Sequence, residues 1–244
     1  MPRHYEPMTE LLYMDNIESN YIREFDAVVT KSKKDYVVLD QSAFYPEGGG
    51  QPSDAGRLTW NDSQAAVSHV AKKGIIKHTL KGDLPPEGTR VHGSLDWERR
   101  YAHMQMHTAQ HIISGIVYDL HEARTVGNQI HADYSRIDFK PASFNDDDLQ
   151  VIEVQCNDVI TGDAMVTITE EQRSSLEERV NPERCNLDLL PSSIKKLRIV
   201  EIEGFDVCPC AGTHVQRTGE IPRISIIKRE SKGKGTERIV YGFA

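Results

Sequence analysis

The sequence has no long apolar segment. No stretch of about 18 apolar residues, the length that a helix needs to cross a bilayer, occurs among its 244 residues. The N-terminal region carries Glu6, Glu10 and Asp15 where a secretory signal peptide would need an apolar centre. We therefore expect a cytoplasmic protein that does not associate with membranes.

Cysteine is scarce. Four cysteines are too few for a disulfide framework in a chain of this length, and nothing directs the chain to an oxidising compartment. We therefore interpret them as thiols or metal ligands. They are Cys156, Cys185, Cys208 and Cys210.

The sequence also lacks an excess of positive charge. Its formal net charge of −8 argues against a sequence-blind attraction of the whole surface to nucleic acid. The charge is uneven, because residues 145–190 carry twelve acidic and three basic side chains, whereas residues 222–244 carry six basic and two acidic ones. The excess of basic side chains at residues 222–244 is explained either by a local basic patch that binds nucleic acid or by an ordinary solvated pair of strands.

The first part of the chain, from about Tyr21 to Leu95, indicates a small all-β unit. Short alternating or β-branched runs follow one another there, separated by turn residues. One turn contains three consecutive glycines, Gly48 to Gly50, which free the backbone for positive φ angles. We place a domain boundary after residue 95.

A long helix is predicted directly after this boundary. Asp96 is a suitable N-cap, and residues 97–121 carry apolar side chains at three- and four-residue spacing. The buried stripe is expected to consist of Ala102, Met106, Ala109, Ile113, Ile116, Val117 and Leu120.

The rest of the chain predicts one more helix and several strands. We expect a hairpin over 129–140 and a helix capped by Asn145, with Leu149, Ile152, Cys156 and Val159 on its inner face. Strands are expected at 164–171, 197–204, 224–230 and 238–243, with an irregular stretch around Pro182 and Pro191. Helices on a mostly antiparallel sheet form an α+β domain, here residues 96–244.

Two histidines on the long helix are candidate metal ligands. His107 and His111 are four residues apart, so their rings lie one turn apart on one face. His103 repeats this spacing, and histidines beside an apolar stripe are often only core-edge residues. No Glu follows His107, which disfavours a zincin-type protease.

Cys210 and His214 repeat the four-residue spacing in a loop of small residues. A thiolate and an imidazole held in this way are a natural second half of a tetrahedral zinc site. A redox pair of Cys208 with Cys210 and a structural zinc knot are the alternatives. Both fit less well, because a redox pair usually has two intervening residues and a zinc knot a second nearby cysteine pair.

Four segments together resemble a known family. HTAQH, GNQIHADYSRIDF and CAGTHV are similar to the editing domain of alanyl-tRNA synthetase, itself a relative of the editing domain of threonyl-tRNA synthetase. AFYPEGGGQPSD resembles the β-barrel that precedes that domain. With no ATP-binding aminoacylation domain in front, the chain resembles the free-standing alanyl-tRNA editing proteins of AlaX type, in their medium-length form. The implied fold is a small β-barrel followed by a two-layer editing domain.

The resemblance implies a zinc-dependent, trans-acting aminoacyl-tRNA deacylase. It would hydrolyse the ester of mischarged alanine tRNA, chiefly with serine and secondarily with glycine, without ATP. The implied ligands of one zinc per chain are His107, His111, Cys210 and His214, and a zinc-bound water would attack the ester, with no side chain assigned as catalytic. A non-catalytic binding module for tRNA or protein, with a structural zinc, is the alternative. The oligomeric state is left open.

Substrate contacts are assigned to three groups of residues. A polar site that bonds the serine hydroxyl would reject alanine, and Thr108, Gln110 and Thr125 are its candidates. The amides of Gly48, Gly49 and Gly50 are candidate contacts to a phosphate or to the aminoacyl end, although a plain tight turn also explains them. Candidate tRNA phosphate contacts, for which a solvated face is the alternative, are Arg99, Arg100, Lys232 and Lys234, with Lys228, Arg229 and Arg238 beside them.

Overall fold

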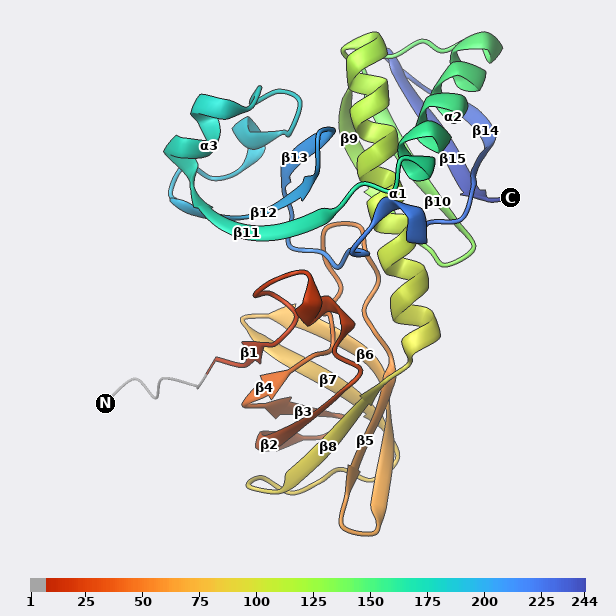
Figure 1. The fold of residues 1–244 in the computed structure, drawn as a ribbon. Helices are drawn as coiled ribbons and strands as arrows, with labels where there is room; N and C mark the ends of the chain where they lie inside the picture. Colours follow the sequence, from red (N-terminus) through yellow and green to blue (C-terminus); the bar gives the residue numbers. More distant parts are fainter. Residues whose placement is uncertain (1–7) are drawn as a thin grey trace. The chain divides into compact units, whose positions relative to one another are not determined.

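The computed structural model describes residues 8–244, which divide into two units (Figure 1). The first unit contains Glu18–Gly48 and Pro52–Arg100 with the segment that ends at Met14. The second contains Tyr101–Ala244 together with Asp15–Ile17 and Gly49–Gln51. The first seven residues, part of the segment where we expect no signal peptide, lie outside the described residues.

The first unit is a closed barrel of six antiparallel strands, which confirms the expected small β-barrel. Its strands are joined in the order β2-β3-β7-β6-β5-β8, so every strand edge is paired within the barrel. Two short strands, β1 and β4, pair in parallel beside it. The bounds are β1 Glu10–Leu11, β2 Glu24–Lys33, β3 Tyr36–Leu39, β4 Gln41–Ser42, β5 Gly56–Trp60, β6 Ser63–Lys73, β7 Ile75–Lys81 and β8 Arg90–Leu95, with a 3-10 turn at Glu18–Tyr21.

The barrel interior is filled by the alternate apolar residues of its strands. Leu39, Leu58, Trp60 and Val67 are buried in one cluster. Inward residues alternate with exposed ones along β6, as the period of a half-buried strand requires. The alternation noted in the sequence therefore marks the faces of real strands.

Helix α1 (Trp97–His121) has the predicted bounds. Oδ1 of Asp96 accepts a hydrogen bond of 3.2 Å from the backbone N–H of Arg99, so Asp96 is the N-cap. The helix is buried on more sides than the predicted stripe, because Met104, Thr108 and Ile112 are also fully buried. Leu120 was wrongly placed in the core and is 40% exposed.

A four-stranded antiparallel sheet, in the order β14-β15-β10-β9, packs against α1 and α2. The strands are β9 Arg124–Gln129, β10 Tyr134–Lys140, β14 Ile224–Gly233 and β15 Thr236–Phe243. Helix α2 (Asp146–Thr161) begins with the expected cap, Asn145, which forms a capping box with Asp148. The predicted hairpin is present, but its first strand starts at Arg124 rather than at Gln129.

A second, three-stranded antiparallel sheet carries half of the candidate metal site. It consists of β11 Val166–Gln172, β12 Lys196–Ile202 and β13 Asp206–Pro209, and β13 runs directly into the loop of Cys210. The stretch expected to be irregular contains helix α3 (Arg173–Arg179) and a 3-10 turn at Leu187–Leu189. A further 3-10 turn spans Thr218–Glu220. Among residues 8–244, no helix is both long and apolar enough to span a membrane.

Candidate metal centre

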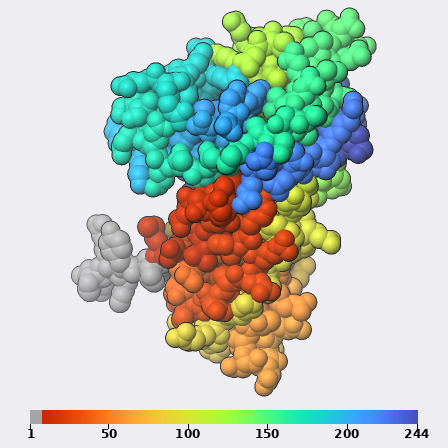
Figure 2. All heavy atoms as spheres, in the orientation of Figure 1, coloured from red at the N-terminus to blue at the C-terminus, as the bar shows by residue number. Residues whose placement is uncertain are grey.

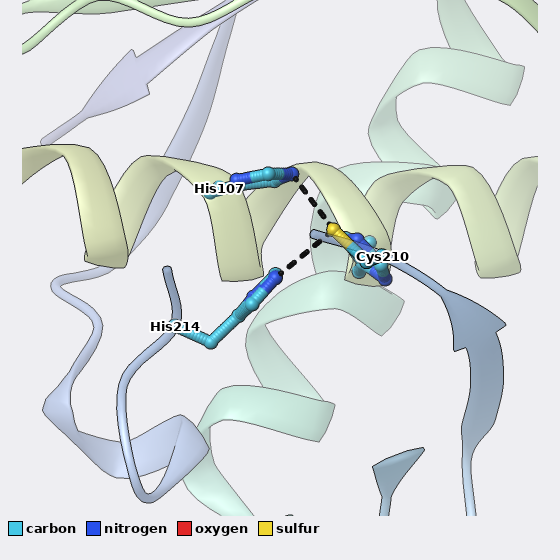
Figure 3. A group of neighbouring side chains, drawn as sticks. His107, Cys210 and His214 are labelled. Carbon is cyan, nitrogen blue, oxygen red and sulfur yellow. Dashed lines mark hydrogen bonds between the residues drawn. The ribbon is translucent and has the colours of Figure 1, made fainter. Parts of the chain in front are cut away.

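Four side chains converge in the second unit. Helix α1 supplies His107 and His111, and the loop after β13 supplies Cys210 and His214. Figure 3 shows His107, Cys210 and His214 turned toward one another. One potential ligand atom from each residue lies within 4.8 Å of the others. The sulfur of Cys210 is 3.6 Å from Nε2 of His107 and 3.4 Å from Nε2 of His214. The two sequence motifs therefore form one group, the single such group within the described part of the chain.

Gly212 lets the Cys210 loop approach the helix. A Cβ atom on Gly212 would lie 2.1 Å from Cε1 of His107, so no other residue fits there without a shift of the loop or of the His107 ring. The Gly212 N–H also donates a hydrogen bond to the Cys210 sulfur at 3.3 Å. The small residues of this loop thus serve close packing and stabilise a thiolate.

His107 is oriented by Gln51. Oε1 of Gln51 lies 2.8 Å from Nδ1 of His107 and also accepts from the Thr213 N–H at 3.1 Å. The Gln51 amide group donates to the hydroxyl of Thr213 at 2.9 Å, which fixes the orientation of the amide. Since Oε1 only accepts, Nδ1 of His107 carries the proton and Nε2 presents a lone pair toward Cys210.

His214 is oriented in the same way by Thr108. The Thr108 hydroxyl donates to the Met104 carbonyl at 3.0 Å, so it accepts from Nδ1 of His214 at 3.1 Å. The Val215 N–H also donates to this hydroxyl at 3.3 Å. Nε2 of His214 therefore presents its lone pair toward the Cys210 sulfur, 3.4 Å away.

His111 is held by a carboxylate. Oδ2 of Asp206 lies 3.5 Å from Nδ1 of His111, and both side chains are buried. Each histidine of the group thus has an acceptor behind its Nδ1 atom, as is usual for metal-bound imidazoles.

The pKa values of three side chains of the group are shifted by burial and by their neighbours. Burial raises the pKa of the Cys210 thiol, but His107 and His214 outweigh it and hold that pKa well below its ordinary value. Burial and His107 lower the pKa of His214 to about 3. Burial lowers the pKa of His111, but Asp206 and Cys210 outweigh this effect and raise it to about 10. Because ligands bind metal without their protons, a metal ion held by this group would have to displace a proton from His111.

Three imidazole nitrogens and one thiolate are a donor set for a borderline-soft transition metal ion. Cys208 lies outside the group. Its thiol contacts the carbonyl of Cys185 at 3.6 Å, and burial together with Asp206 raises its pKa well above the ordinary value. Cys208 is therefore a protonated thiol beside the site.

A cavity of about 300 Å³ adjoins the group and is bordered by His107, His111 and Cys210. A row of polar side chains linked by hydrogen bonds lines this cavity. Asn128 donates to Gln110 at 3.2 Å, Gln110 donates to Ser114 at 2.8 Å, and the hydroxyls of Ser114 and Thr125 lie 2.8 Å apart. The cavity therefore offers amide and hydroxyl groups next to the metal ligands.

The predicted substrate contacts occupy different positions. Gln110, Thr125 and Gly49 line the cavity, whereas Thr108 is fully buried against His214 and is not part of the lining. The φ angle of Gly50 is +84°, and a Cβ there would lie 2.0 Å from Oδ1 of Asn128, so this glycine permits close packing. The remaining glycine, Gly48, accepts a hydrogen bond from the Tyr45 hydroxyl through its carbonyl.

The predicted phosphate contacts also differ in accessibility. Arg100 is fully buried in the first unit, where it pairs with Asp54 and donates to the Asn20 and Ala43 carbonyls, so it has no free donor surface for a phosphate. Arg99 is half-buried and donates to the Ser53 carbonyl.

Most of the C-terminal cations are exposed, and most of them are paired. Lys232 and Lys234 lie at the turn between β14 and β15, where Lys232 is 3.8 Å from Glu230. Glu230 also pairs with Lys228, Arg229 pairs with Glu237, and Arg238 pairs with Asp138. The basic excess read from the sequence is thus reduced by acidic neighbours on the same sheet.

Several residues of the site were missed in the sequence. Gln51 follows the three glycines, but only the glycine amides were considered there. Asp206 precedes Cys210 by four residues and gives no spacing signal of its own. Ser114, Asn128 and Arg184 complete the cavity.

Comparison with known proteins agrees with this arrangement. The family model for the threonyl and alanyl tRNA synthetase second additional domain matches residues 197–240, and that for class II (A) tRNA synthetases matches residues 3–99. The alanyl-tRNA editing protein AlaX-M of Methanosarcina acetivorans is 38% identical over 245 residues, which cover 96% of this chain and 98% of that protein. AlaX-M of Methanosarcina barkeri is 39% identical over 242 residues, with the same coverage.

A synthetase is among the relatives as well. The alanine–tRNA ligase of Thermococcus kodakarensis is 38% identical over 240 residues, which cover 96% of this chain but 26% of the ligase. The two AlaX-M proteins, in contrast, match over nearly their whole length. The chain therefore belongs to the alanyl-tRNA editing proteins of the AlaX type.

Proposed function

We propose that this protein is an aminoacyl-tRNA deacylase that removes serine from mischarged alanine tRNA at a zinc centre. The observation that carries the proposal is the convergence of His107, His111, Cys210 and His214 beside a cavity, in a chain of the AlaX family. The family supports the editing activity, and the donor set supports zinc. Serine and zinc are the specific parts of the proposal.

The four residues would hold one zinc ion. When bound, zinc supplies a Lewis acid that polarises a carbonyl or activates a water for ester hydrolysis. The protein's own part is orientation, since Gln51, Thr108 and Asp206 hold the three rings from behind. The cavity's volume of about 300 Å³ accommodates an amino acid and the start of the attached ribose.

The row of hydrogen-bonded polar side chains on the cavity lining is the proposed source of the selectivity for serine over alanine. Serine and alanine differ by one hydroxyl, and the hydroxyls of Ser114 and Thr125 are within reach of a ligand in the cavity. A serine hydroxyl would join this chain of hydrogen bonds, whereas alanine would leave a buried partner unsatisfied. Sites built in this way discriminate strongly against the analogue that lacks the hydroxyl.

The cavity also favours catalysis over a purely structural metal. A structural zinc is closed on all sides by protein, but three of the four ligand residues here border the cavity. The test is a deacylation assay with purified protein on serine-charged and alanine-charged alanine tRNA, together with metal analysis. We expect about one zinc per chain. We also expect rapid hydrolysis of serine-charged alanine tRNA and no comparable hydrolysis of alanine-charged alanine tRNA. Zinc binding without deacylation would favour the binding-module alternative.

A further inference from the structure

The stretch expected to be irregular forms one side of the cavity. Residues 181–190, called here the wall segment, contribute Arg184, Cys185, Asn186, Leu189 and Leu190 to its lining. This part of the chain lies at the molecular surface and is coloured cyan in Figure 2. Three arginines hold it in place.

Two of these arginines hold the wall segment without reaching the metal group. Arg173 of α3 donates to the carbonyls of Leu187 at 2.8 Å and Leu190 at 3.2 Å. Arg124 of β9 donates to Oδ1 of Asn186 at 3.0 Å and pairs with Asp188. These contacts join the wall segment to α3 and to β9 only.

The third arginine, Arg184, connects the wall segment to a metal ligand. Its guanidinium pairs with Asp119 of α1 and donates to the Phe205 carbonyl at 3.2 Å. Its Nε atom lies 3.4 Å from Oδ1 of Asp206. The other oxygen of Asp206 is the one that faces Nδ1 of His111 at 3.5 Å, so a single carboxylate bridges Arg184 and His111.

The surroundings of Arg184 are built for this contact. A Cβ on Gly115 would lie 3.0 Å from Nη2 of Arg184 and 2.9 Å from Cζ of Phe205, so a glycine on α1 leaves the space that both side chains use. Asp206 is only 8% exposed, and a buried carboxylate requires a charged or hydrogen-bonding partner. Arg184 provides that partner on the side away from His111.

We propose that Arg184 is a positioning residue that acts through Asp206 to fix the ring of His111, so that the wall segment and the metal centre stabilise each other. The inference rests on the metal centre of the proposed function. Partners behind a ligating histidine set its orientation, and their loss typically lowers metal affinity about 10- to 100-fold. Because coupling is reciprocal, metal binding orders the wall segment.

The experiment measures zinc affinity of the full chain by competition with a chelator. We expect Arg184→Ala and Arg184→Gln to lose about tenfold or more in affinity. Arg173→Ala is the matched control, because it loosens the same segment without touching Asp206, and it should bind zinc as the wild type does. In an Asp206→Asn background, Arg184→Gln should cause no additional loss, since residues of one network are not additive.

Two further readouts separate positioning from general destabilisation. The visible spectrum of the cobalt-substituted protein should change in Arg184→Gln and not in Arg173→Ala. Metal should slow hydrogen exchange of the wall segment in the wild type and in Arg173→Ala, but not in Arg184→Gln. Wild-type zinc affinity in Arg184→Gln would overturn the inference. An equal loss of zinc affinity in Arg184→Gln and in the control Arg173→Ala would overturn it as well. A wild type that binds no metal would instead overturn the zinc part of the proposed function.

Discussion

The side-chain oxygen of Gln51 lies 2.8 Å from Nδ1 of His107, although the two residues are 56 positions apart in the chain. The same oxygen accepts from the Thr213 N–H in the loop that carries Cys210 and His214. Gln51 therefore joins the two halves of the metal site. Gly50, directly before it, lies close to Asn128.

Replacing Gln51 with Met should weaken metal binding. The methionine has a similar volume but lacks the oxygen that orients His107, so zinc affinity should fall about 10- to 100-fold. Gln51→Glu keeps an acceptor at that place and should retain most of the affinity. Chelator competition measures both variants, and wild-type affinity in Gln51→Met would show that the ring of His107 needs no such support.

The two cysteines of the Cys208-Pro209-Cys210 sequence should behave differently. Cys210→Ala removes the thiolate of the group and should abolish stoichiometric zinc and deacylation together. Cys208→Ala removes a protonated thiol outside the group and should retain both. Metal content per chain is measured alongside activity on serine-charged tRNA. Equal loss in the two variants would mean that the ligand assignment is wrong.

The sequence predicts features that depend on neighbouring residues and misses those that depend on residues distant in the chain. The bounds of α1 were predicted because Asp96 and the apolar spacing act locally. The start of β9 was missed because residues 124–129 are half-buried and carry no alternating apolar pattern. Gln51 and Asp206 were missed because each is defined by a partner distant in sequence. Arg100 was predicted as a candidate tRNA phosphate contact, but it is buried in the first unit, where the charge of Asp54 stabilises it.

Substitutions of Thr125 and Thr108 should have different effects, the first on selectivity for serine over alanine and the second on metal binding. Thr125→Val removes a hydroxyl from the cavity and should shift the serine-to-alanine ratio of kcat/KM by about 1 kcal/mol, or about fivefold, toward alanine. Thr108→Val removes the acceptor of His214 instead and should lower activity on both substrates in parallel, with loss of zinc. Kinetics on both charged tRNAs decide this. A ratio shift in Thr108→Val alone would place the serine sensor behind His214.

The barrel should lose stability in mild acid because of His78. This histidine is fully buried, with Nε2 2.8 Å from the Ser42 hydroxyl. Burial, only partly offset by a hydrogen bond with the Val37 backbone, lowers its pKa from 6.5 to about 4. Between these values the unfolded chain binds a proton that the folded barrel does not. Stability is therefore complete above pH 6.5 and falls as the pH drops toward 4, by about 3 kcal/mol in total.

His78→Gln should remove this dependence. Both tryptophans, Trp60 and Trp97, belong to the first unit, so tryptophan fluorescence during denaturant unfolding reports on the barrel. The difference in unfolding free energy between the wild type and His78→Gln should shrink or reverse from pH 7 to pH 4.5, because only the wild type carries the acid penalty. His69→Gln, at a half-exposed histidine of β6, is the matched control and should keep the wild-type pH dependence. A constant difference between the wild type and His78→Gln would show that His78 is not the acid-sensitive group.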